Sequence, residues 1–141
     1  MPKTKTKAWV VFSGQADLPW LKILKDGYRH CYVLLNDGMH WITIDPLSNT
    51  MEVTVHDLPL NFDLPLWMKN NGHLIVPANI HHHETQAPWM LFSCVEVVKR
   101  VLGIHRRFII TPWQLYKHLQ KEQTAQIFQP DSCKGDFAWE A

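Results

Sequence analysis

A cysteine stands at the predicted start of a helix, where a thiol ionises readily. In the run Ser93-Cys94-Val95-Glu96, Ser93 and Glu96 match the S-x-x-E capping box of a helix N-terminus, and Gly103 is a suitable stop. Cys94 then lies beside unpaired backbone N–H groups and the positive end of the helix dipole. Both stabilise a thiolate. Cys94 is therefore a candidate nucleophile, and the alternative is a small buried apolar residue.

A histidine and an aspartate are predicted to face each other across a β-hairpin. Segments 30–35 and 40–45 have the β-branched and aromatic content of strands, and the Asp-Gly pair at 37–38 is a two-residue turn signal. In a type I′ turn, His30 falls opposite Asp45, and both side chains share one face of the sheet. Opposing Cβ atoms lie about 4.5–5.5 Å apart, so the carboxylate is within reach of the imidazole.

A thiol that attacks a carbonyl needs a thiolate, a base and a group that orients the base, and these residues supply all three. They lie in three segments, which are Tyr28-Arg29-His30-Cys31-Tyr32-Val33-Leu34, His40-Trp41-Ile42-Thr43-Ile44-Asp45 and Ser93-Cys94-Val95-Glu96. The order of strand histidine, polar hairpin partner and helix cysteine resembles the circularly permuted branch of the NlpC/P60 papain-like cysteine hydrolases. That branch includes lecithin:retinol acyltransferase-like proteins and related bacterial hydrolases. The resemblance covers residues 28–103, about half of the chain.

The resemblance implies a role for each matching residue. Cys94 would be the nucleophile, His30 the base and Asp45 the residue that orients the base. His40 is the rival third residue, because a histidine fills that position in some members. The predicted hairpin register places His40 on the other face of the sheet.

The mechanism implied by the resemblance passes through a thioester that water or another acceptor resolves. The oxyanion would meet the backbone N–H of Cys94 and one further donor. Gln86, eight residues before the cysteine, and Gln15, after the first strand, are the candidates for that donor. Trp89, five residues before the cysteine, is a candidate for lining a substrate groove.

A histidine-rich loop offers a different chemistry. On an extended segment His81 and His83 point the same way and would share a cation with Glu84 or Cys94, with His73 nearby in sequence. Consecutive histidines do not easily occupy three corners of a tetrahedron, so we expect neither a metal nor a cofactor. We expect the loop, His82 included, to wall the cleft.

The three cysteines are too few and too widely spaced for a disulfide framework or a CxxC zinc site. Cys31 alternates with His30 and is expected in the core, and Cys133 is expected to be an exposed thiol in a polar turn. A reducing compartment follows, and the basic N-terminus lacks the apolar region of a secretory signal. The predicted location is the cytoplasm, with a virion-associated or released protein as the alternative.

Composition excludes other classes of protein. The chain has 141 residues, of which 46% are hydrophobic, and a net charge of +1. It is long and apolar enough to bury a core, and its charge gives no general attraction to nucleic acid. No run approaches the roughly 18 apolar residues of a membrane span. The expected partner is a peptide or acyl-amide substrate, and the sequence indicates no oligomeric state.

The predicted fold is a single papain-like α+β domain over residues 1–141, with 1–7 and roughly 122–141 as extended or peripheral ends. An antiparallel sheet of four to six strands packs against the helix that carries Cys94. Strands are expected at 8–13, 30–35, 40–45, 50–56 and 73–76, with a helical turn at 67–71 and helices beginning near 94 and 112.

Two functions of different classes follow. The first is a thiol-dependent hydrolase, an amidase or peptidase acting on substrates such as cell-wall peptides, with acyl transfer as a variant. The second is a non-catalytic accessory or assembly protein, of the phage or mobile-element type, with the same fold. A metal-dependent protein that uses the histidine loop is a weaker third.

Overall fold

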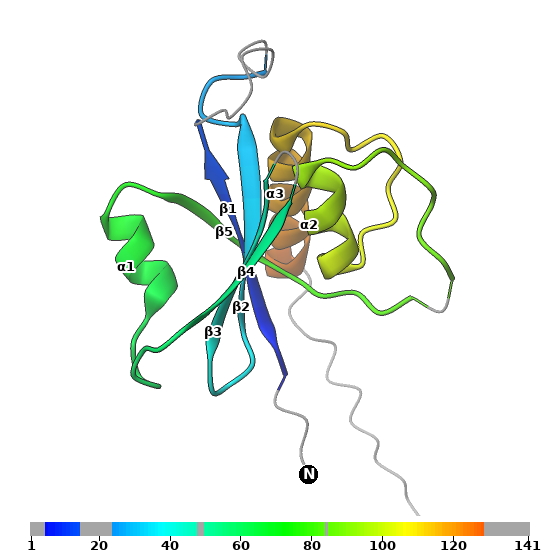
Figure 1. Cartoon of the computed structure of the whole chain (residues 1–141). Helices are drawn as coiled ribbons and strands as arrows, with labels where there is room; N and C mark the ends of the chain where they lie inside the picture. The colour runs from blue at the N-terminus through cyan, green and yellow to red at the C-terminus, as the bar shows by residue number, and fades with distance from the viewer. Residues whose placement is uncertain (1–4, 15–23, 48–49, 84, 129–141) are drawn as a thin grey trace, which may run out of the picture.

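Antiparallel strands form one five-stranded sheet in the order β4-β3-β2-β1-β5 (Figure 1). The computed structural model describes residues 5–14, 24–47, 50–83 and 85–128, and all structural statements concern these residues. The elements of this described part are β1 (Lys7–Ser13), β2 (His30–Asn36), β3 (Trp41–Pro46), β4 (Met51–His56), α1 (Leu64–Asn70), β5 (Leu74–Ala78), α2 (Cys94–Leu102) and α3 (Pro112–Phe128). The class is α+β, and the sheet lies within the predicted range of four to six strands.

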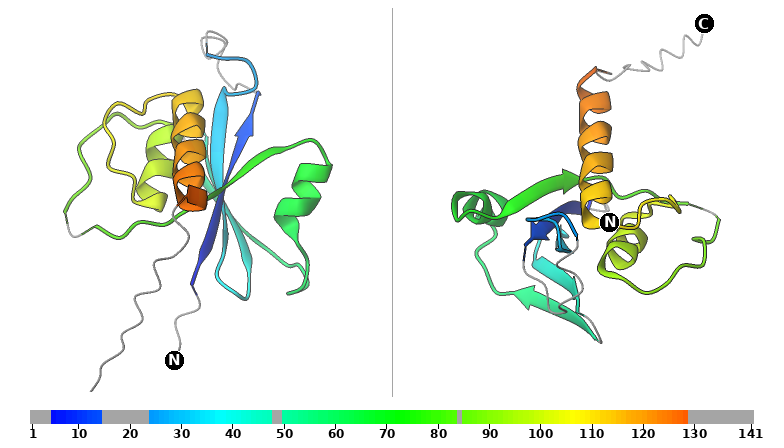
Figure 2. Two further views of the ribbon diagram at one scale, coloured as in Figure 1. Left: turned by 180° about the vertical axis from the view of Figure 1, so that it is seen from behind. Right: turned by 90° about the horizontal axis from the view of Figure 1, so that it is seen from above.

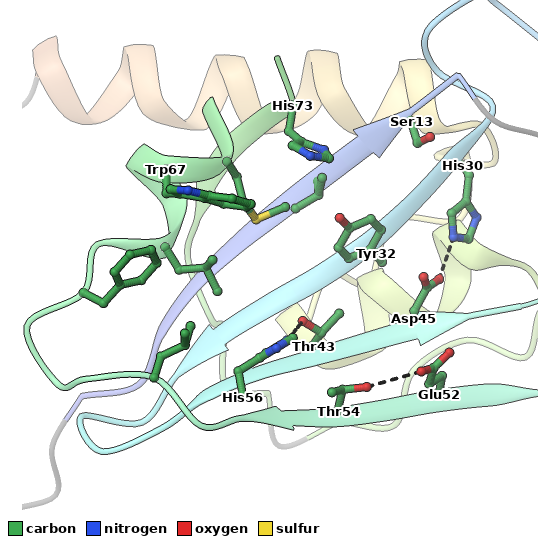
Figure 3. Close-up of a pocket in the computed structure, with 15 residues that line it drawn as sticks. Ser13, His30, Tyr32, Thr43, Asp45, Glu52, Thr54, His56, Trp67 and His73 are labelled. Atoms are coloured by element: carbon green, nitrogen blue, oxygen red, sulfur yellow. Dashed lines mark hydrogen bonds and ion pairs between the residues drawn. The ribbon is translucent and has the colours of Figure 1, made fainter. Parts of the chain in front are cut away.

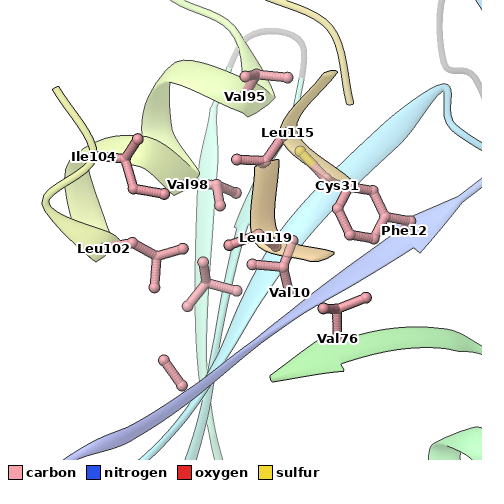
Figure 4. Close-up of a cluster of buried hydrophobic side chains, with 12 residues drawn as sticks. Val10, Phe12, Cys31, Val76, Val95, Val98, Leu102, Ile104, Leu115 and Leu119 are labelled. Carbon is pink, nitrogen blue, oxygen red and sulfur yellow. The ribbon is translucent and has the colours of Figure 1, made fainter. Parts of the chain in front are cut away.

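The sheet has helices on both faces. Helices α2 and α3 cover one face and α1 lies on the other, as Figures 1 and 2 show from three directions. Side chains alternate along a strand, so neighbours such as Val10 and Val11 are buried on opposite faces. The core under α2 and α3 (Figure 4) consists of Ala8, Val10, Phe12, Cys31, Val33, Val76, Val95, Val98, Leu102, Ile104, Leu115 and Leu119. The smaller core under α1 consists of Val11, Leu34, Trp41, Leu64 and Met68.

Helix α2 has the predicted boundaries and caps. Ser93 Oγ accepts a hydrogen bond from the Glu96 N–H at 3.1 Å, and Gly103 ends the helix in the left-handed region at φ 70°. The Glu96 carboxylate instead pairs with Lys99 Nζ at 3.0 Å, and both side chains are buried. Lys99 Nζ also donates to the Ile109 carbonyl, which ties α2 to the loop before α3.

The hairpin between β2 and β3 has a different register from the predicted one. Asn36 pairs with Trp41, so four residues form the loop, and the predicted two-residue type I′ turn is wrong. The Asp37 carboxylate accepts hydrogen bonds from the backbone N–H groups of Met39 and His40, at 2.8 and 2.6 Å. These bonds favour the longer loop. The register shift is two residues, so every side chain keeps its predicted face although its cross-strand partner changes.

Helix α1 and strand β5 extend beyond the predicted segments. Asp63 caps α1 by accepting from the Leu66 N–H at 3.0 Å, so the helix begins before the predicted turn at 67–71. Strand β5 is an edge strand and tolerates Pro77 for that reason.

Strand β1 and helix α3 reach into segments that were expected to be peripheral. Strand β1 begins at Lys7, and α3 continues to Phe128. Helix α3 begins with a capping box, because Gln114 Oε1 accepts from the Thr111 N–H and Thr111 Oγ1 from the Gln114 N–H. Leu115 and Leu119 are buried against the core. No helix in these ranges is both long and apolar enough to cross a lipid bilayer.

Replacing Gly103 with alanine should destabilise the protein strongly. A Cβ at this position would overlap the backbone carbonyl of His81, and φ 70° is unfavourable for any L side chain. We expect Gly103→Ala to lower the free energy of unfolding by about 3 kcal/mol or more. Gly72→Ala is the matched control, since φ is +85° there but a Cβ would meet nothing within 4 Å. It should cost only about 1 kcal/mol in the same urea titration. Equal losses would contradict the assigned clash.

Candidate cysteine–histidine–aspartate site

The site forms where β2 and β3 stop pairing. Their ladder ends at Val33 and Ile44, although β2 extends back to His30 and β3 extends on to Pro46. Helix α2 packs mainly against β2 and also touches β3. The first residue of α2, Cys94, therefore meets the first residues of β2 beside this opening in the sheet.

His30 and Asp45 make the contact that the sequence predicts, although they are not directly opposite. The pair nearest to them is Val33 with Ile44, so continuing the ladder would leave Asp45 diagonal to His30. Diagonal partners on one face remain within reach of long side chains. His30 Nε2 donates to Asp45 Oδ1 at 2.6 Å, and the two side chains are 19% and 27% exposed (Figure 3). Since Asp45 occupies Nε2, Nδ1 is the ring nitrogen left for the sulfur.

Three groups beside the Cys94 sulfur favour its ionised form. They are the side chain of His30, the side chain of Cys31 and the backbone N–H of Cys31. The contact between Cys94 and His30 could not be predicted from the sequence, because no pattern in the hairpin indicates which end of the sheet α2 covers. The structure thus brings Cys94, His30 and Asp45 into one chain of contacts.

The contacts of Cys94 affect the pKa of its thiol more than burial does. The hydrogen bond from Cys31 is the largest influence, and together with the hydrogen bond and positive charge of His30 it lowers the pKa of Cys94 from 9.0 to about 5. Burial acts in the opposite direction. At neutral pH the sulfur is a thiolate.

His30 shows the complementary shift. Burial alone would lower the pKa of the imidazole, but the hydrogen bonds and charges of Cys94 and Asp45 raise it from 6.5 to about 9. Between pH values of about 5 and about 9 the site therefore holds a thiolate–imidazolium ion pair.

Cys31 has a role in the site that the sequence does not reveal. It is fully buried in the core under α2, as predicted. Burial, followed by the hydrogen bond and charge of Cys94, raises the pKa of Cys31 well above 9.0, so its thiol stays protonated. A protonated thiol is a donor for the neighbouring thiolate. The only signal in the sequence is its position next to His30.

The other predicted site residues lie elsewhere or outside the described residues. His40 is exposed in the hairpin loop, where its Nδ1 lies 3.5 Å from Asp37 Oδ2, so it is not the third residue. Gln86 is exposed and Trp89 is 84% exposed, both on the loop that leads into α2. Gln15 lies outside the described residues.

The histidine loop points away from Cys94. His81 Nε2 lies 3.3 Å from Glu122 Oε1 of α3, and His118 Nε2 lies 3.2 Å from the same oxygen. The rings of His83 and His105 stack at 4.2 Å. Within the described ranges no three of the histidine, cysteine, aspartate and glutamate side chains form a group able to hold a metal ion. Glu84 is not among the described residues.

A pocket of about 600 Å³ opens on the α1 side of the sheet and reaches His30 and Asp45 (Figure 3). This volume is typical of small-molecule sites. Its walls are Val11, Ser13, His30, Tyr32, Thr43, Asp45, Glu52, Thr54, His56, Leu58, Phe62, Leu64, Trp67, Met68 and His73. Cys94 is not one of them, so the pocket contacts the imidazole and the carboxylate from the face opposite α2.

No family model matches the chain, and neither a curated protein nor a solved structure matches it. The geometry brings the side chains of Cys94, His30 and Asp45 together on an α+β scaffold.

Removing the Cys31 thiol should make Cys94 a weaker acid. Cys31→Ala deletes the hydrogen bond that contributes most to lowering the Cys94 pKa, while the Cys31 backbone donor stays. We expect the pH midpoint of Cys94 alkylation by iodoacetamide, followed by peptide mass spectrometry, to rise by about one unit or more. Cys31→Ser is the control, since its hydroxyl remains a donor and should recover part of the shift. An unchanged midpoint in Cys31→Ala would remove Cys31 from the site.

Proposed function

We propose that this protein is a thiol-dependent hydrolase, an amidase or peptidase of the papain-like type. The proposal rests on the contacts that join Cys94 to His30 and His30 to Asp45. Through these contacts the pKa of Cys94 falls to about 5 and the pKa of His30 rises to about 9. Such a pair is the activated nucleophile and acid–base group that acyl transfer requires. The permuted NlpC/P60 relationship is part of the proposal and is supported by residue order and by the cysteine helix on an antiparallel sheet.

In the first half of the reaction, the Cys94 thiolate attacks the carbonyl carbon and the C–S bond forms. The negative charge that develops on the carbonyl oxygen meets the Cys94 N–H, which belongs to the first turn of α2 and has no intrahelical acceptor. As the C–N bond breaks, the His30 imidazolium gives its proton to the departing amine. The products are a Cys94 thioester, the free amine and a neutral His30.

In the second half, neutral His30 takes a proton from water as the water oxygen attacks the thioester. The C–S bond breaks, the acid leaves, and the thiolate–imidazolium pair is restored. Asp45 holds Nε2 of the imidazole throughout, so that Nδ1 faces the sulfur. An acceptor alcohol or amine in place of water makes the same site an acyltransferase.

Mutations should distinguish the roles of Cys94, His30 and Asp45. With fluorogenic peptide and acyl amides as substrates, Cys94→Ala should abolish turnover, and His30→Ala should lower kcat/KM by about 10²–10⁴-fold because it removes the proton-transfer group. Asp45→Asn should lower kcat/KM by less, since the base is present but less well oriented.

His40→Ala is the matched control, because that imidazole lies in the exposed loop. Full activity in His30→Ala would contradict the assigned base. A wild-type protein that cleaves none of these amides would leave the accessory or assembly role as the better description.

The pH dependence should follow the two shifted groups. The value of kcat/KM should rise as pH increases through about 5, where Cys94 becomes a thiolate, and fall as pH increases through about 9, where His30 loses its proton. In Asp45→Asn the alkaline limb should move to lower pH, because the Asp45 charge helps to hold the proton on His30. An acid limb near pH 9, the ordinary value for a thiol, would contradict the ion pair.

A further inference from the structure

We infer that the pocket under α1 binds the leaving-group side of the substrate, and that this side carries an apolar group without a negative charge. The inference rests on the proposed hydrolase function and deepens it. It narrows the substrate from peptide amides in general, cell-wall peptides included, to amides whose departing amine bears an aromatic or branched aliphatic group.

The assignment to the leaving-group side follows from which catalytic residues the pocket touches. His30 and Asp45 line it, and Cys94 does not (Figure 3). The amine that departs must lie within hydrogen-bond reach of the imidazolium that protonates it. The acyl carbon, in contrast, must lie against the sulfur. A cavity that opens onto the imidazole and not onto the sulfur therefore faces the amine.

The walls indicate the chemistry of the group that fits. Beyond the imidazole the pocket is closed by side chains of α1 and the segment before it, among them Phe62, Trp67 and Met68. Leu64 and Met68 belong to the core and are fixed, whereas Trp67 is 50% exposed and covers the pocket from outside. Apolar walls around a pocket of this size stabilise an aromatic or branched aliphatic group by removing it from water.

The charges of the lining disfavour a carboxylate on the amine. Asp45 and Glu52 are the acidic residues of the wall, and the cation beside them, the His30 imidazolium, is already paired with Asp45. A further carboxylate in the pocket would be repelled by these two and would have to compete with Asp45 for the imidazolium. The amine product, which becomes an ammonium ion in water, suits this environment.

The test uses substrates with one acyl group and three leaving groups: phenylalaninamide, glycinamide and phenylalanine with its free carboxylate. We expect kcat/KM for the phenylalaninamide substrate to exceed each of the other two by about tenfold or more. Trp67→Ala should remove most of the preference over glycinamide, and Glu52→Gln should reduce the discrimination against the free carboxylate. Trp89→Ala is the matched control, because that indole is exposed on the loop before α2 and does not line the pocket.

A binding measurement separates this inference from the hydrolase proposal. In Cys94→Ala, which cannot react, phenylalaninamide should shift the indole N–H resonance of Trp67 and leave that of Trp89 in place, and glycinamide should shift neither. Binding at Trp67 without turnover by the wild-type protein would contradict the hydrolase proposal and support the pocket as a binding site. Turnover with no leaving-group preference and no shift at Trp67 would keep the hydrolase and overturn the pocket assignment.

Discussion

The site depends on the position of the N-terminus of α2, which lies beside the end of the ladder between β2 and β3. Strands β2 and β3 pair only as far as Val33 and Ile44, and beyond that point the Cys31 N–H donates to the sulfur of Cys94. An unpaired backbone donor in a buried position would cost free energy comparable to a lost hydrogen bond. Here the thiolate accepts it, so the opening in the sheet and the ionised cysteine stabilise each other.

Burial and charge compete at this site, and the arrangement of partners decides the outcome. Desolvation opposes the charged form of both Cys94 and His30. Each charge is nevertheless favoured, because the partner of opposite sign is adjacent and each has a further contact, Cys31 for the thiolate and Asp45 for the imidazolium. Cys31 serves as a donor because its own burial keeps it protonated. The same hydrophobic core that packs the fold thus maintains the acid–base state of the site.

Local signals in the sequence were sufficient for some features and insufficient for others. The caps of α2 and the alternation of β2 lie within a few residues, so the helix and the faces of His30 and Cys31 were predictable. The hairpin register was not, because the Asp37 side chain bonds two backbone N–H groups and favours a longer loop. Asp45 stayed on the face of His30 only because the error was an even number of residues. The contact of Cys31 with Cys94 and the pocket under α1 depend on segments far apart in the chain, for which no local pattern exists.

The two faces of the sheet divide the work of the proposed reaction. Helices α2 and α3 hold Cys94 in place through a continuous core, which includes Cys31 and packs against Cys94. Helix α1 contributes nothing to that core and instead closes the pocket over the other face. His30 is the point where the two halves meet, since one ring nitrogen is left for the sulfur and the ring also lines the pocket. The proposed selection of substrate at α1 and the proposed activation of the thiol at α2 therefore rest on separate packing.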